Sequence, residues 1–377
     1  MHRLTFLMWL HLKNTITPCK GIELIECFGS AEKVYLADKK SYMEHGITNP
    51  AVLKSLTDKN ICRADKEIME CARLGIRLIG YGMEEYPEIL GEIPDPPLIL
   101  YVRGDVSVLH CRNAFCIVGT RRSTVYGMSA ALGVSEQLAR CGMVIVSGVA
   151  VGIDSAAHRG AVRGGGKTIG IMGCGLDVEY PAENGDVRKA IIENGALISE
   201  FPLGTPPFPG NFPIRNRLLS AFSLGVAVME ASERSGALIT AKYAAEQGRD
   251  VFALPGNISS PMSAGTNALI QDGAALLTGA DSILAEYIMR YPDCFSTLEI
   301  EPEETTAVSK EEAATLQNPG VTAPEKKVYK VMGKEPLHVN EIARLSETPI
   351  HEVQAMITML QIKGKIKEHP GNRYSTQ

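Results

Sequence analysis

The sequence predicts an α/β protein with an extended Rossmann-like fold, that is, a doubly wound and mostly parallel sheet. The first observation is a series of short apolar runs after Asn113, namely AFCIVG, MVIVSG, KTIGIMG, ALISE, GVAVME, DVFALPG and ALLTG. The second is that helical patterns separate these runs, which implies right-handed βαβ crossovers. The third is helical patterning on both flanks, which predicts a small N-terminal helical domain and a C-terminal winged helix.

The length of 377 residues leaves room for two or three domains with a sizeable core. We predict a helical N-terminal domain over residues 1–80 and a Rossmann-like domain over 81–290. An acidic linker over 291–320 and a winged-helix domain over 321–377 complete the chain. The linker contains EIEPEE and KEEAA and few large apolar residues, a composition typical of loosely held segments.

Composition excludes several classes of protein. The formal net charge is −5, so a nucleic-acid site has to be a local patch or pocket. The 9 cysteines form no C-x-x-C pair, which indicates reduced thiols in the cytoplasm, with no metal site and no disulfide scaffold. The N-terminal apolar run is interrupted by His11 and Lys13 and lacks a cleavage site, so we do not expect secretion. No run reaches the length of a membrane span.

The helical segment over residues 1–80 carries no chemistry of its own. Its small helices and glycine turns favour a packing or protein-contact domain, while LLxxFGS-like segments also occur in helix–hairpin–helix modules that touch DNA backbones. Residues 86–105 are rich in proline and lead into an extended segment, which we interpret as the connection onto the edge of the main domain. At the other end, three helices and a hairpin that turns at Pro370-Gly371 are typical of a winged helix.

The first motif, IVGTRRSTVYG, is a strand, a tight turn and a helix start over residues 117–127. Gly119 lets the backbone turn, Thr120 offers a hydroxyl, and Arg121 and Arg122 stand where an anion would lie. We favour phosphate contact over an ordinary turn with surface arginines. Because the full G-x-G-x-x-G spacing is missing, NAD binding is not indicated, and we expect no cofactor.

The second motif, SGVAVGIDSAAH, again places small residues after a strand, at Ser147, Gly148 and Gly152. Asp154 and His158 stand one helical turn apart and could form a hydrogen-bonded pair. We favour a structural role for both, because a metal site would need further ligands nearby.

Two further segments lie between the motifs. Lys167 ends a flexible glycine turn just before the run KTIGIMG, and Asp177 follows a glycine pair as a structural or pocket-forming residue. We expect all of these motifs to meet outside the carboxyl ends of the strands, where ligands bind in such sheets.

The third region, FPIRNR and ASERSGALITA, holds Arg215, Asn216 and Arg217 at a helix entry and Ser235 and Gly236 at another helix start. Free backbone N–H groups at a helix start can approach an anion. Arginines beside aromatic rings suit single-stranded nucleic acid. A rigid, proline-braced loop with salt-bridged arginines explains the same residues equally well.

With these motifs in this order, followed by a closing PGN, the chain resembles the bacterial DNA-processing protein A family, also called Smf, over about residues 86–277. The resemblance implies a homodimer that binds single-stranded DNA without catalysing a reaction. It also implies protection of incoming strands during natural transformation and loading of the RecA recombinase onto them. By this analogy, side-chain contacts come from Arg121, Lys167, Arg215 and Arg217, and backbone or hydroxyl contacts from Gly148, Gly152, Ser235 and Gly236.

The chain departs from the family pattern at two places. Val151 stands where many members have a basic residue, and Ala182-Glu183 where some have lysine. Both changes lower the local positive charge, so binding should depend more on Arg121 and Arg215. In the tail, HEVQAMITMLQ has no arginine or lysine before Lys363, so we do not expect specific reading of a major groove.

The alternative function is that of an enzyme. SGALITAKYAAE loosely resembles the PGGxGTxxE loop of Rossmann-like phosphoribohydrolases, with Thr240 and Glu246 in comparable places. Ser235-Gly236 replaces the first glycine pair of that loop, and the spacing to the glutamate is longer.

Overall fold

The computed structural model describes residues 3–291 and parts of the C-terminal segment, namely 328–333, 337–346, 348, 353, 356–357, 360, 365–369 and 373–376. The chain divides into two compact units, Met1–Leu298 and Glu299–Gln377, which are treated separately below. The predicted acidic linker, apart from Tyr291, lies outside the described residues. Within the described ranges no helix is both long enough and apolar enough to cross a bilayer.

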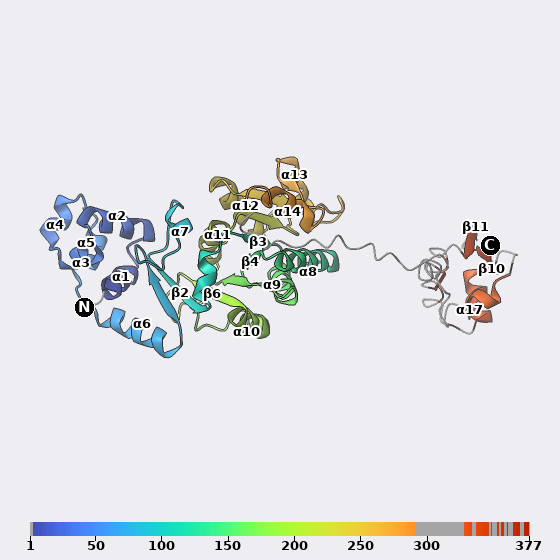
Figure 1. Cartoon of the computed structure of the whole chain (residues 1–377), viewed down its shortest axis with the longest axis horizontal. Helices are drawn as coiled ribbons and strands as arrows, with labels where there is room; N and C mark the ends of the chain where they lie inside the picture. The colour runs from blue at the N-terminus through green and yellow to red at the C-terminus, as the bar shows by residue number, and fades with distance from the viewer. Residues whose placement is uncertain are drawn as a thin grey trace. The chain divides into compact units, whose positions relative to one another are not determined.

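The first unit is built on a nine-stranded sheet of order β1-β2-β6-β5-β4-β3-β7-β8-β9 (Figure 1). All seven apolar runs predicted as strands are strands. These seven strands, β6-β5-β4-β3-β7-β8-β9 in the order of the sheet, all pair in parallel. The strands are β1 (Arg77–Gly80), β2 (Ile99–Gly104), β3 (Ala114–Val118), β4 (Val144–Ser147), β5 (Thr168–Ile171), β6 (Gly195–Ser199), β7 (Gly225–Val228), β8 (Asp250–Ala253) and β9 (Ala275–Leu276).

Helices cover both faces of this sheet, which is why the central strands are apolar throughout. Every residue of β3, β4 and β7 is buried, as expected for strands packed on both sides. One core joins β3 to α8, α9 and α14 through residues such as Phe115, and another joins it to α11 and α12 through Cys116. The helices are α7 (Glu88–Gly91), α8 (Val125–Arg140), α9 (Ile153–Arg163), α10 (Gly185–Glu193), α11 (Asn211–Ala221), α12 (Gly236–Glu246), α13 (Ala264–Gln271) and α14 (Ala280–Tyr287).

The N-terminal helices share a core with the sheet and belong to the same unit. Tyr101 on β2 donates hydrogen bonds to the sulfur of Met8 (3.4 Å) and to the carboxylate of Glu67 (3.1 Å). The predicted boundary at residue 80 falls after β1, and β1 and β2 extend the sheet as antiparallel strands. These helices are α1 (Arg3–His11), α2 (Pro18–Phe28), α3 (Ala31–Leu36), α4 (Lys39–Glu44), α5 (Pro50–Thr57) and α6 (Cys62–Arg73).

The second unit contains a three-stranded antiparallel sheet of order β10-β12-β11. Its elements are β10 (Leu337–His338), α17 (Val339–Leu345), β11 (Ile366–His369) and β12 (Arg373–Thr376). Buried apolar side chains that include Val328, Ile342 and Ile366 form its core. The β11/β12 hairpin is the predicted wing, while its turn at Pro370-Gly371 lies outside the described residues.

Candidate nucleic-acid interface

A cavity of about 560 Å³ opens where the direction of the chain across the sheet reverses. After β3 the chain builds β4, β5 and β6 on one side, and then returns to build β7, β8 and β9 on the other. Loops that leave β3 and β7 therefore diverge, and a crevice forms at the end of the strands. We call the loops that follow the parallel strands the carboxyl rim, and those that precede them the amino rim.

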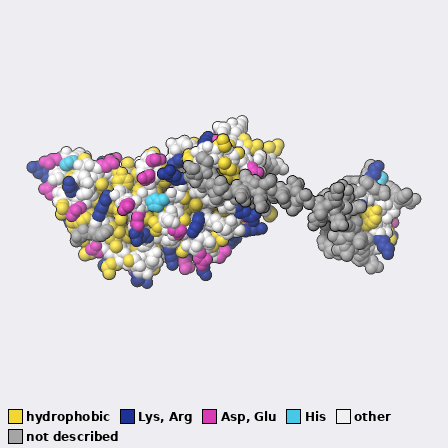
Figure 2. Space-filling view, in the orientation of Figure 1, with side chains coloured by type: hydrophobic (Ala, Val, Ile, Leu, Met, Phe, Trp, Pro, Cys, Tyr) yellow, Lys and Arg dark blue, Asp and Glu magenta, His cyan; other side chains and the backbone are white. Residues whose placement is uncertain are grey.

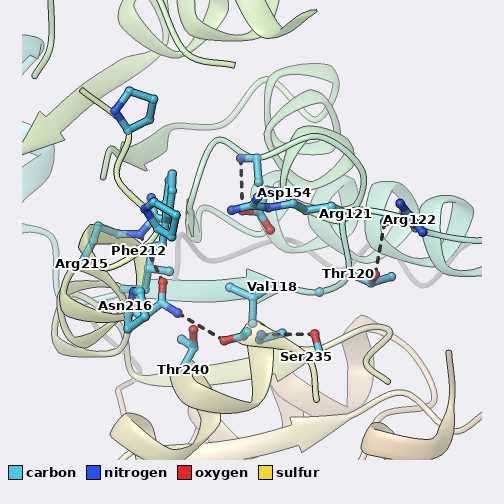
Figure 3. A pocket seen from close by; sticks show the side chains of 18 of the residues that line it. Val118, Thr120, Arg121, Arg122, Asp154, Phe212, Arg215, Asn216, Ser235 and Thr240 are labelled. Carbon is cyan, nitrogen blue, oxygen red and sulfur yellow. Dashed lines mark hydrogen bonds between the residues drawn. The ribbon is translucent and has the colours of Figure 1, made fainter. Parts of the chain in front are cut away.

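Eight of the residues predicted to contact DNA line this cavity, and two of the predicted pocket-forming residues line it with them (Figure 3). Their loops are far apart in the sequence, so the prediction that several motifs meet at one edge is confirmed for these ten. The ten residues are Gly119, Thr120, Arg121, Arg122, Arg215, Asn216, Ser235 and Gly236, with Asp154 and Thr240.

Glu230, which sequence analysis missed, holds the loop of the first motif in place. Its side chain is 2 % exposed and accepts hydrogen bonds from the backbone N–H and the hydroxyl of Thr124, at 2.8 and 2.5 Å. The backbone N–H of Thr120 donates to the carbonyl of Glu230 at 2.8 Å. Because both ends of the turn are tied to the segment after β7, Arg121 and Arg122 stay at the rim of the cavity. The sequence held one signal for this role, because the buried run GVAVME ends in a glutamate.

Phe212 lies close to two arginines of the cavity, Arg121 and Arg215 (Figure 3). Its ring centroid is 5.0 Å from the guanidinium carbon of Arg121 and 5.9 Å from that of Arg215. Both distances suit cation–π contact. In the part of the chain that the structure describes, no carboxylate lies within ion-pair distance of Arg121 or Arg122. The cavity therefore presents one exposed cation, Arg121, beside an aromatic ring, with a second exposed cation, Arg122, next to it in the chain.

Arg215 supplies a fixed positive charge below this surface. Only 4 % exposed, it donates hydrogen bonds to the carbonyls of Gly148 (2.8 Å) and Ile171, at the ends of β4 and β5. Burial lowers the pKa of Arg215, while the nearby carboxylate of Asp154 acts to raise it. Because the arginine guanidinium is too basic to lose its proton in a protein, it remains charged. Carbonyl oxygens satisfy its donors without neutralising its charge.

Asp154 is the acidic residue among those that line the cavity. Its side chain accepts a hydrogen bond from the backbone N–H of Ala150 at 3.3 Å. Burial raises the pKa of Asp154 to about 6, while the charge of Arg215 and the Ala150 hydrogen bond act in the opposite direction. Three arginines against one carboxylate leave the cavity with a positive balance at neutral pH. This contrasts with the outer surface, where basic and acidic side chains are interspersed on the face seen in Figure 2.

The start of α12 forms the opposite wall. The hydroxyl of Ser235 accepts a hydrogen bond from the backbone N–H of Ala237 at 3.3 Å, which caps the helix. Asn216 donates to the carbonyl of Gly236 at 3.3 Å and so joins α11 to α12. Both polar side chains thus fix the wall that they line, and the positive end of the α12 dipole faces the cavity.

Arg217 does not line the cavity, contrary to our prediction. It is 5 % exposed, and both of its terminal nitrogens pair with the carboxylate of Glu200, at 2.5 and 2.7 Å. A carboxylate oxygen of Asp95 lies 3.4 Å from its Nε. The physical reason is helical geometry, since two residues along α11 rotate a side chain by about 200° away from Arg215.

Lys167 also lies elsewhere, contrary to the prediction that it shares this edge. It immediately precedes β5 and so stands on the amino rim, where its Nζ is 3.3 Å from a carboxylate oxygen of Asp105. A residue before a parallel strand lies at the opposite end of the sheet from a residue after it. The position of Lys167 before the run KTIGIMG was therefore the signal that we misinterpreted.

The glycine motif at the end of β4 packs against the residues that line the cavity. Ser147 donates its hydroxyl to the carbonyl of Ile117 at 2.6 Å. A Cβ on Gly148 would lie 2.7 Å from Arg215 and from Asp154. Gly152 has a φ of 86° and passes close to the carbonyl of Thr120, 2.7 Å from where its Cβ would be. These three residues position the lining residues and do not themselves line the cavity.

Two of the predicted pocket residues are also structural. The Nδ1 of His158 lies 2.7 Å from the hydroxyl oxygen of Thr168, and burial lowers the pKa of His158 to about 3. Asp177 accepts hydrogen bonds from the backbone N–H of Gly204 at 2.9 Å. The possible Asp154–His158 hydrogen bond is not formed, since each side chain has a different partner. Across the described ranges, no group of three or more His, Cys, Asp or Glu side chains is arranged to hold a metal ion.

Comparison with known proteins identifies relatives along most of the chain. Residues 77–288 match the family described as DNA recombination-mediator protein A, and residues 312–372 match the DprA winged helix domain. Protein Smf of Synechocystis sp. is 35 % identical over 308 residues, which cover 77 % of each chain. The DNA processing protein DprA of Bacillus subtilis is 38 % identical over 63 % of this chain and 80 % of its own.

Two solved structures are similar as well. The X-ray structure of DprA from Streptococcus pneumoniae has a TM-score of 0.67 and 34 % identity, covering 75 % of this chain and 97 % of that chain. The Helicobacter pylori protein has a TM-score of 0.52 and 32 % identity, covering 57 % and 97 %, and its structure is described as giving insights into a unique single-stranded DNA binding mode. The extended Rossmann-like sheet, the site on its carboxyl rim and these matches agree, and the chain belongs to the DprA/Smf family of DNA recombination mediators, with the winged-helix domain of that family at its C-terminus.

Proposed function

We propose that this protein binds single-stranded DNA in the carboxyl-rim cavity without catalysing a reaction. The observation that carries the proposal is the group of Arg121, Phe212 and Arg215, in which two guanidinium carbons lie within 6 Å of the centre of one aromatic ring. Cations that follow a backbone and rings on which bases stack are the two components of single-strand recognition. The Helicobacter pylori relative, whose structure is described in terms of single-stranded DNA binding, supports the same assignment.

The depth of the site favours an unpaired strand over a duplex. Arg215 and Asn216 lie within the cavity and are less than a tenth exposed, so a ligand has to enter to reach them. A flexible single strand can insert one nucleotide into a cavity of about 560 Å³, whereas the bases of a duplex are held inside the helix. The cavity therefore selects against paired DNA by shape.

The wider role that we propose follows the family. In it, the protein acts in the cytoplasm as a homodimer, protects incoming strands during natural transformation and loads the RecA recombinase onto them. A fixed cationic cavity suits this task, because phosphate contacts grip any sequence. The assembly and the RecA contact rest on the family resemblance.

The structure disfavours the phosphoribohydrolase alternative. Thr240 lines the cavity, but Glu246 lies at the far end of α12, where its carboxylate is 3.7 Å from Nζ of Lys242. Both side chains of this pair are more than half exposed. The carboxylate needed for hydrolysis is thus not in the cavity. Release of free base from nucleoside monophosphates would revive the alternative.

The proposal is tested by replacing Arg121 and Arg122 together with alanine. We expect affinity for oligothymidylate to fall by about tenfold or more, because two charge-assisted contacts are lost. The slope of log affinity against log salt should become less steep by about 1.4. Arg63→Ala/Lys66→Ala removes the same charge from exposed positions on α6 and serves as the control. Unchanged retention of single strands by the Arg121/Arg122 variant in a gel-shift assay would refute the site.

A further inference from the structure

A second cavity, of about 510 Å³, lies on the amino rim of the same sheet. Its lining includes residues that precede three parallel strands, namely Arg112 before β3, Leu224 before β7 and Arg249 before β8. With a rise of about 3.3 Å per residue, strands of this length separate the two rims by roughly 15 Å. An occupant of this cavity would thus leave the carboxyl-rim cavity free.

Two groups of residues with opposite charge line this cavity, and we call them its basic wall and its acidic wall. Arg112 and Arg249 lie on the wall formed by the sheet, together with His110 at the end of η1 (Val106–His110). The acidic wall is the segment around α7, which lines the cavity with carboxylates at a spacing of four residues, from Glu84, Glu88 and Glu92.

These charges are not paired with one another. No ion pair involving either arginine or any of the three glutamates is formed with another described residue, so every nitrogen–oxygen distance between the two groups exceeds 4 Å. In addition, Nε of Arg249 is buried and has no hydrogen-bond acceptor among the described residues.

We infer that this cavity binds a peptide segment of a partner protein that carries both acidic and basic side chains. A nucleic acid would meet the three glutamates, and a purely basic peptide would meet the two guanidiniums, so each would be repelled by one wall. A segment of mixed charge pairs with both. Apolar surface from Tyr86, Ile89 and Tyr291 completes the lining and suits a polypeptide.

The test uses fluorescence anisotropy of the full chain with three labelled peptides of equal length. One alternates aspartate and lysine between Gly-Ser spacers, one carries only aspartate, and one carries only lysine. We expect the alternating peptide to bind about tenfold more tightly than either of the others. Saturating oligothymidylate should not displace it, because the two cavities lie on opposite rims.

Two single variants assign the binding to this cavity. Arg112→Gln and Glu88→Gln should each weaken binding of the alternating peptide by about three- to tenfold, since each removes one charged contact. Lys66→Gln and Glu32→Gln make the same changes at exposed sites on α6 and α3 and should have no effect. Melting temperature and affinity for single-stranded DNA, measured for all four, report on folding. Equal binding by variants and controls, or equally tight binding of the acidic peptide, would overturn the inference.

Discussion

The two rims of the central sheet use arginine in different ways. On the carboxyl rim, Arg215 is buried against carbonyl oxygens, and Arg121 lies beside an aromatic ring, so neither forms an ion pair with a described carboxylate. On the amino rim, Lys167 is paired with Asp105, and the cavity that holds Arg112 is faced by glutamates. Strand direction alone separates these two environments.

The comparison extends to two arginines within one helix. Arg215 and Arg217 are both about 95 % buried on α11, yet the first is held by neutral carbonyls and the second by Glu200. A guanidinium neutralised by a bidentate carboxylate is a structural element, whereas one held by carbonyls still attracts an anion. Burial does not distinguish the two roles, but the charge of the partner does.

The largest effect that we expect is on stability, from Arg217→Ala. This change leaves Glu200 buried without its partner and should lower the free energy of unfolding by about 3–5 kcal/mol. Replacing both residues by apolar ones of similar volume, as in Arg217→Met/Glu200→Leu, should recover most of that loss. Denaturant unfolding of both variants measures this. A single variant as stable as the wild type would remove the distinction between the two arginines.

Sequence reasoning predicted the sheet and its carboxyl rim because both leave strong local signals. Apolar runs alternate with helices, and small or basic residues follow the runs directly, as at Arg121 and Ser235. The antiparallel strand β1 was missed, and β2 was predicted only as an extended connection at the edge of the main domain, because neither belongs to a βαβ repeat. Their place in the sheet depends on long-range pairing.

The site was predicted less completely than the fold because side-chain direction is not a property of residue type. FPIRNR shows two arginines, and only helical rotation distinguishes the one that faces the cavity. Glu230 and Phe212 contact residues distant in sequence, at Thr124 and Arg121, so neither role is visible locally. Periodicity would have separated Arg217 from Arg215, and order along the strand would have placed Lys167.

A smaller effect should follow from Phe212→Ala. This change removes an aromatic ring from the carboxyl rim and leaves every charge there in place. Affinity for single-stranded DNA should fall by about 1–3 kcal/mol, the contribution of one base stacked on an aromatic side chain. The salt dependence should stay unchanged, because no phosphate contact is lost. Filter binding over a salt series checks both, with Phe28→Ala, a half-buried aromatic residue on α2, as the control. A changed salt slope would mean that Phe212 acts by positioning Arg121.

The next effect concerns pH and Asp154, whose pKa is raised to about 6 by burial. Below this pH the carboxyl becomes protonated, and the cavity loses its negative charge. Affinity for single-stranded DNA should therefore rise as the pH falls through about 6, by about 0.5–1 kcal/mol. Protonation should also stabilise the fold, because the folded state holds this proton more tightly than the unfolded state between the unfolded pKa of about 4 and pH 6.

Asp154→Asn tests this directly, because the amide keeps the shape and cannot ionise. The variant should bind DNA at pH 7 as the wild type does at pH 5, and its affinity should vary less over that range. His158 does not titrate there, since burial lowers its pKa to about 3. Fluorescence anisotropy against pH measures the difference. Parallel pH profiles for the two proteins would assign the dependence to another group.

The smallest effect should come from Lys167→Ala. Its size shows whether single-stranded DNA contacts the carboxyl rim alone or both rims. Lys167 is 53 % exposed and pairs with Asp105 on the amino rim, so its loss should change affinity for single-stranded DNA by less than about twofold. Arg121→Ala removes one positive charge likewise, but from the carboxyl rim, and should cost several times more. Comparing the two in one gel-shift series cancels the common change in net charge. Equal losses would mean that the strand passes over both rims, and that the sheet does not separate DNA binding from the second cavity.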